Sequence, residues 1–182
     1  DTMAIDVKKE YSRWLEKAYD MEDQLKSMNE DLVFDAFYRN LDFGTAGLRG
    51  VIGCGTNRMN SYTVGKATQG LANYLVKAYK TPSVCIGYDS RIKSDVFAKD
   101  TAEVLAANGI KVHLWPQLNP VPTVSFATRY LKASAGVMIT ASHNPSKYNG
   151  YKVYGEDGCQ MTTEAADAVL REIEKIDIFE DV

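Results

Sequence analysis

Hydrophobic residues follow two different spacings in the middle of the chain. Between residues 64 and 78, apolar side chains recur every three or four positions, which predicts a helix with one apolar face. Residues 84–86 are apolar without interruption, which is typical of a short strand covered on both faces. Ser94 can cap a second helix, which Asn108 and Gly109 would end. A strand therefore lies between two helices.

The same alternation continues toward the C-terminus. Residues 110–115 alternate between apolar and other side chains, which predicts a half-buried strand near a sheet edge, with Ile110, Val112 and Leu114 facing inward. Prolines then introduce a short helix ending near Arg129. Residues 136–139 and 151–154 predict two more strands, and Thr162 opens a last helix. This order predicts a three-layer α/β/α sandwich around a mainly parallel mixed sheet.

The N-terminal part has a different character. Residues 5–38 are rich in good helix formers, and they predict one long helix or two consecutive ones, with Tyr11, Trp14, Leu15 and Ala18 on one face. Residues 41–60 contain five glycines and form a loop or a loop-strand-loop. We therefore divide the chain into an N-terminal helical arm, residues 1–40, and an α/β domain, residues 41–182.

Composition narrows the possible partners. The 182 residues suit one domain, and 45% apolar with 25% charged residues is average for globular proteins. The net charge is −3 and the basic residues are scattered, which argues against nucleic acid as a partner.

No apolar stretch is long enough for a membrane span or a signal peptide, so we expect a cytoplasmic protein. Three well-separated cysteines indicate reduced thiols, and two histidines without paired cysteines make a complete metal site improbable.

Two polar clusters directly follow the predicted buried strands. One contains Asp89 and Arg91, and the other runs from Thr140 to Asn144. Open α/β sheets bind ligands at the edge where such strands end, so both clusters should meet at one crevice. Asp89 and Arg91 either orient the loops of the site or form a structural ion pair, and the pair alone favours the second interpretation.

Ser142 is the candidate acceptor of a chemical group. A serine hydroxyl needs a base to take its proton and cations to offset charge, and His143, Lys152 and Arg49 could supply them. The glycine-rich run at 44–50 would let backbone amides approach an anion beside Arg49. Taken alone, the same residues also fit a turn in which Ser142 satisfies backbone groups, and a glycine-rich surface loop.

Three segments in this order resemble one family. Residues 43–50 read Phe-Gly-Thr-Ala-Gly-Leu-Arg-Gly, residues 87–91 read Gly-Tyr-Asp-Ser-Arg, and residues 140–145 read Thr-Ala-Ser-His-Asn-Pro, followed by Asn-Gly-Tyr-Lys at 149–152. Together they are similar to domain 1 of the α-D-phosphohexomutases, the phosphoglucomutase/phosphomannomutase family. Residues 57–60 and 67–70 are closest to its phosphoglucomutase-2/phosphopentomutase-like branch.

The resemblance implies a covalent relay. In the family, the serine matching Ser142 carries a phosphoryl group, passes it to a sugar monophosphate and takes back the other phosphate of the resulting bisphosphate. Lys152 would be the general base and acid, with His143 and Arg49 as helpers. We expect Thr45, Gly47, Asn144 and Asn149 to contact substrate or phosphate. Mg²⁺ would bind the Ser142 phosphoryl group, and glucose 1,6-bisphosphate or a similar bisphosphate would act as activator.

The resemblance also implies missing parts. Family members have four domains, and this chain lacks the Asp-Gly-Asp-x-Asp-Arg magnesium loop, the sugar loop and the C-terminal phosphate loop. We expect those domains of the same polypeptide as partners, and a chain that is inactive alone.

The expected function is interconversion of glucose 1-phosphate and glucose 6-phosphate, with mannose phosphates next. Alternatives are a phosphopentomutase, a bisphosphate synthase, a serine hydrolase or phosphatase, and a non-catalytic sugar-phosphate-binding module. No Gly-x-Ser-x-Gly motif surrounds Ser142, which argues against the common hydrolases.

Overall fold

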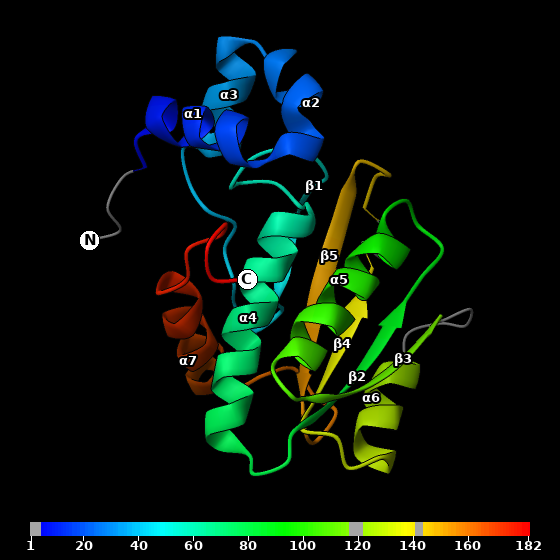
Figure 1. The fold of residues 1–182 in the computed structure, drawn as a ribbon. Helices are drawn as coiled ribbons and strands as arrows, with labels where there is room; N and C mark the ends of the chain where they lie inside the picture. The colour runs from blue at the N-terminus through cyan, green and yellow to red at the C-terminus, as the bar shows by residue number, and fades with distance from the viewer. Residues whose placement is uncertain (1–4, 117–121, 141–143) are drawn as a thin grey trace.

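A five-stranded sheet with helices on both faces forms the body of the protein (Figure 1). The computed structural model describes residues 5–116, 122–140 and 144–182. The elements are α1 (Val7–Lys17), η1 (Tyr19–Met21), α2 (Glu22–Lys26), α3 (Glu30–Phe37), β1 (Leu48–Val51), α4 (Ser61–Ala78), β2 (Ser83–Tyr88), α5 (Ser94–Ala107), β3 (Lys111–Pro116), α6 (Pro122–Tyr130), β4 (Ala135–Ile139), β5 (Tyr148–Gly155) and α7 (Thr163–Glu174).

The strands are ordered β1-β5-β4-β2-β3. β2 pairs in parallel with β3 and β4, whereas β5 is antiparallel to both β4 and β1. Four strands therefore run in one direction and β5 alone runs in the other, which confirms the mixed, mainly parallel sheet. β3 lies at an edge and β4 in the middle. Because β2 and β4 are adjacent and parallel, their carboxyl ends are neighbours, as expected for a ligand-binding edge.

The two faces of the sheet are covered differently. Side chains from α4, α5 and α7 pack on one face, where they form the main core with Val84, Ile86, Val137, Ile139, Tyr151 and Val153. On the other face, α6 packs against β2 and β4, and it approaches Gly136 so closely that an added Cβ would lie 2.3 Å from Thr128 Oγ1. This confirms the three-layer arrangement. The second face is less fully covered because α6 is its one helix among the described residues.

The helical arm has a core of its own. It folds as three α-helices rather than the expected one or two, because Asn29 accepts a hydrogen bond from the Leu32 amide and begins α3 anew. Trp14 and Ala18 are fully buried, as their common face predicted, and they pack with Leu25, Phe37 and other residues outside the main core. The arm therefore forms a separate layer at one end of the sheet, visible at the top of Figure 1.

Two local expectations were wrong. Ser94 does not cap α5: the N-cap is Lys93 at φ 70°, and the Ser94 hydroxyl donates to Asp89 Oδ1 at 2.7 Å instead. Leu114 is 44% exposed and does not face inward, although it lies in β3 at the edge of the sheet, where the expectation placed the strand. Thr162 and the Asn108–Gly109 pair do begin and end their helices as predicted.

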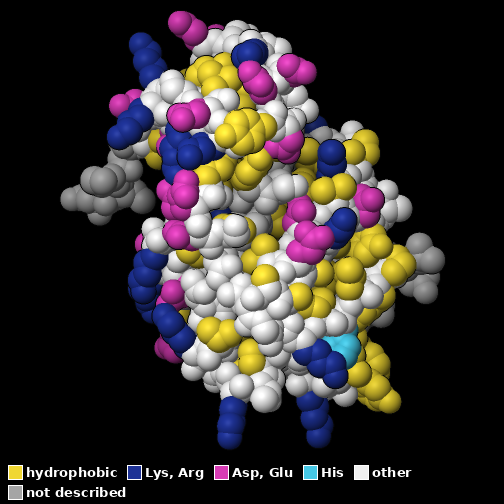
Figure 2. Space-filling view, viewed as in Figure 1, with side chains coloured by type: hydrophobic (Ala, Val, Ile, Leu, Met, Phe, Trp, Pro, Cys, Tyr) yellow, Lys and Arg dark blue, Asp and Glu magenta, His cyan; other side chains and the backbone are white. Residues whose placement is uncertain are grey.

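The surface carries both signs of charge. In Figure 2, acidic and basic side chains are intermingled over the visible face, without a continuous basic stripe. Within the described ranges, no helix combines the length and apolarity that crossing a bilayer would require.

Two glycines of α4 give a matched test of how closely α4 and α7 pack. A Cβ at Gly70 would lie 2.3 Å from Ile173 Cγ1 and 3.0 Å from its backbone nitrogen, whereas one at Gly65 would meet only a terminal methyl of Val182 at 3.0 Å. We expect Gly70→Ala to lower the free energy of unfolding by about 1–3 kcal/mol. Gly65→Ala should raise it by up to about 1 kcal/mol through helix propensity. Urea denaturation of both variants measures this, and equal effects would contradict the close packing.

Candidate active site

A pocket of about 600 Å³ lies where the glycine-rich loop meets the first half of β5. Arg49 and Lys152 contribute cationic side chains to its wall, and Thr45 and Gly47 come from the loop before β1. The remaining lining residues are Asp42, Gly44, Ala46, Leu48, Thr140, Asn144 and Gly150. Residues from three of the segments singled out in the sequence, at 43–50, 140–145 and 149–152, therefore meet at one place.

The register of β1 on β5 puts both cations on the same face of the sheet. Leu48 pairs with Tyr151 and faces the main core, so its neighbour Arg49 and the residue after Tyr151, Lys152, face the other way. Arg49 is paired with Gly150, and Lys152 is the next side chain along that face of β5. The Cα atoms of such diagonal neighbours lie about 7–8 Å apart, so two long side chains at these positions can contact the same phosphate. The face that α6 covers only in part therefore presents positive charge at the pocket.

The glycine-rich loop is drawn tightly onto β5. Gly44 and Gly47 exchange backbone hydrogen bonds of 3.2 and 2.8 Å, which closes the loop around Thr45 and Ala46. Gly47 has φ 80°, and a Cβ there would lie 1.9 Å from the carbonyl oxygen of Tyr151. Only glycine fits this conformation and this approach without displacement. The loop backbone consequently lies directly beside Lys152.

The Asp89 cluster supports the neighbouring loop. Arg91 Nη1 donates a 2.6 Å hydrogen bond to the carbonyl oxygen of Asn144, and Asp89 Oδ1 accepts from the Arg91 amide at 3.0 Å. The Asp89 amide in turn donates to Ile139 O at the end of β4. The two polar clusters therefore meet, as expected, but Asp89 and Arg91 position the loop and do not line the pocket.

Asn149 differs from its expected role as a phosphate contact. Its side chain is fully buried, and its amide nitrogen donates to Ser94 Oγ at 3.0 Å and to Ile92 O at 3.3 Å. Its side-chain oxygen accepts from the Gly150 amide at 2.7 Å. In this arrangement the amide binds α5 to β5 and does not reach the pocket. The sequence signal was ambiguous because an Asn-Gly pair is as typical of a turn as of a ligand contact.

Ser142 and His143 lie outside the described residues. The residues on either side of this gap, Thr140 and Asn144, both line the pocket, and Thr140 is 5% exposed. Thr140 is hydrogen-bonded through its amide to Gly150 O at 3.0 Å. The chain therefore enters and leaves the segment 141–143 at the pocket wall. Sequence reasoning placed Thr140 in the second polar cluster without giving it a role of its own. It did not single out Asp42, which directly precedes the segment 43–50.

The described residues suit an anion and do not suit Mg²⁺ by themselves. No group of three or more His, Cys, Asp or Glu side chains that could hold a metal occurs among them. Asp42, the one carboxylate among the described lining residues, is ion-paired with Arg39. A hard divalent cation prefers several oxygen ligands, whereas two cations and a glycine-rich loop favour phosphate.

A second pocket of about 670 Å³ lies between the arm and α7, and it is less suitable. Its cations are Lys66 and Arg39, and its acids are Glu174 and Asp42, so the charges balance. Burial lowers the pKa of Lys66 from its ordinary value. Of its lining residues, only Phe43 belongs to one of the three recognised segments, and Asp42 directly precedes that segment.

Comparison with known proteins identifies the family of this chain. Residues 40–179 match the family model for phosphoglucomutase/phosphomannomutase, alpha/beta/alpha domain I. A phosphoglucomutase of Staphylococcus epidermidis is 47% identical over 162 residues, and one of Staphylococcus aureus is 42% identical over 165 residues. These alignments cover 82% and 90% of this chain but 30% of each relative.

Solved structures support the same fold. A crystal structure from Thermus thermophilus, provisionally assigned as a phosphomannomutase, has a TM-score of 0.67 and 34% identity over 79% of this chain and 32% of its own. A phosphoglucomutase/phosphomannomutase family protein of Burkholderia thailandensis has a TM-score of 0.59 at 22% identity, covering 73% of this chain and 30% of its own, which shows the fold alone.

An α/β/α domain whose sheet carries a pocket lined by two cations and a glycine-rich loop has a structure that suits a phosphate ligand. The chain belongs to the phosphoglucomutase/phosphomannomutase family and comprises its domain I, which is about 30% of the length of the curated relatives.

Gly47 and Gly44 provide a matched pair for testing the loop geometry. Gly47→Ala would place a methyl group against Tyr151 O in a left-handed backbone conformation, whereas a Cβ at Gly44 meets nothing within 4 Å. We expect Gly47→Ala to lower the free energy of unfolding by about 2 kcal/mol or more and Gly44→Ala to change it by less than about 0.5 kcal/mol. Equilibrium denaturation measures both. A fully stable Gly47→Ala protein would contradict the described approach of the loop to β5.

Proposed function

We propose that this chain is the phosphoserine domain of a phosphohexomutase, in which Ser142 relays a phosphoryl group to and from a sugar phosphate. One observation carries the proposal: Arg49 and Lys152 line a single pocket with Thr140 and Asn144, the residues that flank the segment containing Ser142 and His143. Phosphoryl transfer depends mainly on positioning and on neutralising charge, and this pocket supplies both.

The proposed step transfers one phosphoryl group from the phosphoenzyme to the sugar and one proton from the sugar to the enzyme. A sugar hydroxyl attacks the phosphorus of phospho-Ser142, a new sugar–phosphate bond forms, and the bond to Ser142 Oγ breaks. Lys152 gives a proton to Ser142 Oγ as that bond breaks and takes the hydroxyl proton in its place, so that its own charge is unchanged. The reverse step then uses the other phosphate of the bisphosphate, so the net reaction is an isomerisation. Arg49 stabilises the charge on the transferring oxygens, with His143 beside it.

Asp89, Arg91 and Asn149 act indirectly in this proposal. Arg91 binds the carbonyl oxygen of Asn144 and the Asp89 amide binds that of Ile139, so both ends of the loop 140–144 are fixed. Asn149 binds the Gly150 amide. Mg²⁺, which the family resemblance implies, would need ligands from outside the described residues, with the phosphoryl group on Ser142 as one of them. The mechanism proposed for these residues therefore contains no metal step.

The substrate class follows from the relatives. Two are named phosphoglucomutases, and the solved structure from Thermus thermophilus was provisionally assigned as a phosphomannomutase. We therefore propose glucose 1-phosphate and glucose 6-phosphate first and mannose phosphates second, with a bisphosphate as activator. The sugar itself would be recognised largely by domains beyond this chain.

Ser142 can be tested by labelling. The full-length protein incubated with glucose 1,6-bisphosphate should gain the mass of one phosphoryl group on the peptide containing Ser142. Ser142→Ala should abolish the gain with unchanged thermal unfolding. Absence of label in the parent protein would favour a non-catalytic sugar-phosphate-binding module over a mutase.

The two cations should be essential for rate. Arg49→Met and Lys152→Met should each lower kcat about 10²-fold or more, because charge in the transition state loses a preorganised partner. Lys147→Met is the matched control, since Lys147 is an exposed cation near the start of β5 that does not line the pocket. Coupled assay of glucose 6-phosphate formation measures all three. A similar loss in the control would show that net charge, and not the pocket, matters.

The isolated 182-residue chain should be nearly silent. The chain has a pocket whose cations suit phosphate, but its described residues contain no cluster of three or more side chains that could hold a metal. The chain also spans only 30% of the relatives' length. We expect no isomerase turnover above background from this chain under conditions in which the full-length protein is active. Robust turnover by the short chain would refute the division of the site between domains.

A further inference from the structure

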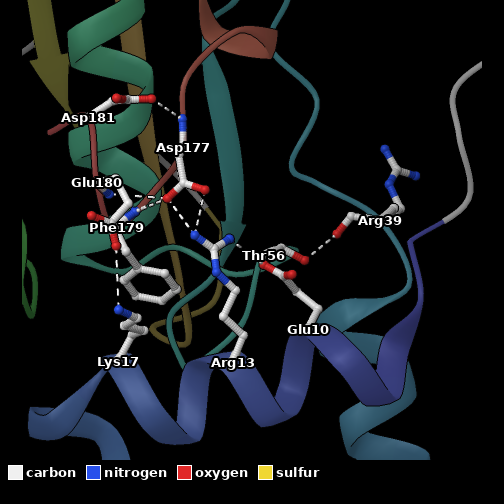
Figure 3. A network of polar contacts seen from close by, with 9 residues as sticks. All are labelled: Glu10, Arg13, Lys17, Arg39, Thr56, Asp177, Phe179, Glu180 and Asp181. Atoms are coloured by element: carbon white, nitrogen blue, oxygen red, sulfur yellow. Dashed lines mark hydrogen bonds and ion pairs between the residues drawn. The ribbon is translucent and has the colours of Figure 1, made fainter.

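The last residues of the chain are bound by the N-terminal arm. Asp177 follows α7, and each of its two carboxylate oxygens accepts a hydrogen bond of 2.5 Å from Arg13 Nη2 of α1 (Figure 3). The same carboxylate accepts the amides of Phe179 at 3.0 Å and Glu180 at 3.1 Å. One side chain therefore folds the segment 176–180, here called the exit segment, and joins it to the arm.

An aromatic cluster completes the contact. The Phe179 ring packs edge-on against Trp14 and Tyr62 at 5.3 Å between centroids, and the Arg13 guanidinium lies 5.0 Å from the Phe179 centroid. Ile178 is buried in the core of the arm. Arg13 thus contacts both the carboxylate and the ring of the exit segment. The side chains of Arg13 and Asp177 are 30% and 36% exposed, so the strength of this pair comes from its two hydrogen bonds and from the contact of Arg13 with the Phe179 ring.

The arm is also fixed to the body of the domain, so it can transmit position. Arg58, which precedes α4, is ion-paired with Asp35 of α3 at 2.5 Å, and the Asn57 amide donates to Ala36 O at 2.9 Å. Gly55 approaches α3 so closely that a Cβ there would lie 2.5 Å from Ala36 O. The arm is therefore held by the loop before α4 on one side and binds the exit segment on the other.

The exit segment lies at the end of the matched domain. The family match ends at residue 179, and the curated relatives are about three times as long as the part they share with this chain. In a full-length mutase, the polypeptide would leave domain I through this segment toward the domains that hold the sugar. The direction of the segment would then affect how those domains face Ser142.

We propose that Arg13 is a positioning residue: the arm clasps the exit segment and so sets the direction in which the chain leaves domain I. This rests on the proposed mutase function. Desolvation raises the pKa of Asp177, but hydrogen bonds from the Phe179 amide and Arg13 outweigh it and hold the pKa below its ordinary value, so Asp177 stays ionised for Arg13.

The test compares Arg13→Met with Lys17→Met in the full-length protein. Lys17 also reaches the exit segment, through a 3.4 Å pair with Glu180, but the two side chains of that pair are 41% and 64% exposed. Exposed pairs of this kind contribute little. Lys17→Met therefore removes a cation from the same helix without breaking the clasp, and Arg13→Lys tests whether charge alone is sufficient.

Two readouts separate positioning from simple stability. Amide hydrogen exchange at residues 178–181 should rise about tenfold in Arg13→Met and remain unchanged in Lys17→Met, because local opening becomes easier. The ratio of sugar bisphosphate released to sugar monophosphate isomerised should also rise about tenfold, because misplaced domains lose the intermediate before it reorients. This ratio does not depend on how much of the enzyme is folded. Arg13→Lys should give intermediate values.

The outcomes distinguish this inference from the proposed function. Parent protein that neither labels Ser142 nor isomerises sugar phosphates would overturn the mutase proposal, and the clasp as a positioning device with it, whatever the exchange data show. Normal labelling and turnover with an unchanged release ratio in Arg13→Met would overturn the positioning role alone. Unchanged exchange at residues 178–181 would overturn the clasp itself.

Discussion

The pairing of β1 with β5 in a single register is the constraint on which the site depends. Leu48 opposite Tyr151 sends Arg49 and Lys152 to the same face, where they line one pocket. A slip by one residue would turn Arg49 into the main core and Leu48 out toward the anion. Two short segments separated by about a hundred residues in the chain therefore depend on one alignment for their shared charge.

Contacts on the opposite face keep that alignment in place. The fully buried Tyr151 hydroxyl lies 2.9 Å from Thr68 Oγ1 of α4, and burial raises the pKa of Tyr151, so the phenol stays neutral. Thr68 also donates to Val64 O within its own helix. Because the side chain of Tyr151 is pinned to α4 while its carbonyl oxygen limits the approach of Gly47, β5 cannot shift without disturbing the core and the loop together.

The regular elements could be predicted because their hydrophobic spacing is local, and the order of β2, α5, β3, α6 and β4 follows directly from it. The meeting of the two polar clusters could also be predicted, since parallel strands place their carboxyl ends at one edge. The roles of Ser94 and Asn149 could not. Both are polar residues at turns, where a cap, a ligand contact and a buried hydrogen bond look alike in sequence, and only the approach of α5 to β5 decides between them. The contact between Arg13 and Asp177 could not be predicted either, because the two residues are far apart in the chain and neither belongs to a motif.

The distribution of rigid and open parts follows the needs of phosphoryl transfer. Arg49, Lys152 and Gly47 are placed by strands and by a loop pressed against a strand, which suits groups that must meet a phosphate in a fixed geometry. Among the described elements, α6 is the one helix that covers the face they occupy; it packs against β2, β4 and β5, and none of its residues lines the pocket. In the proposed function, a sugar held by other domains would enter the pocket from the part of this face that α6 leaves open. A domain that kept this face closed could bind phosphate but could not exchange it with a reorienting bisphosphate. Under the proposed function, the partly open face and the contact between the arm and the exit segment would be complementary features of one task divided among domains.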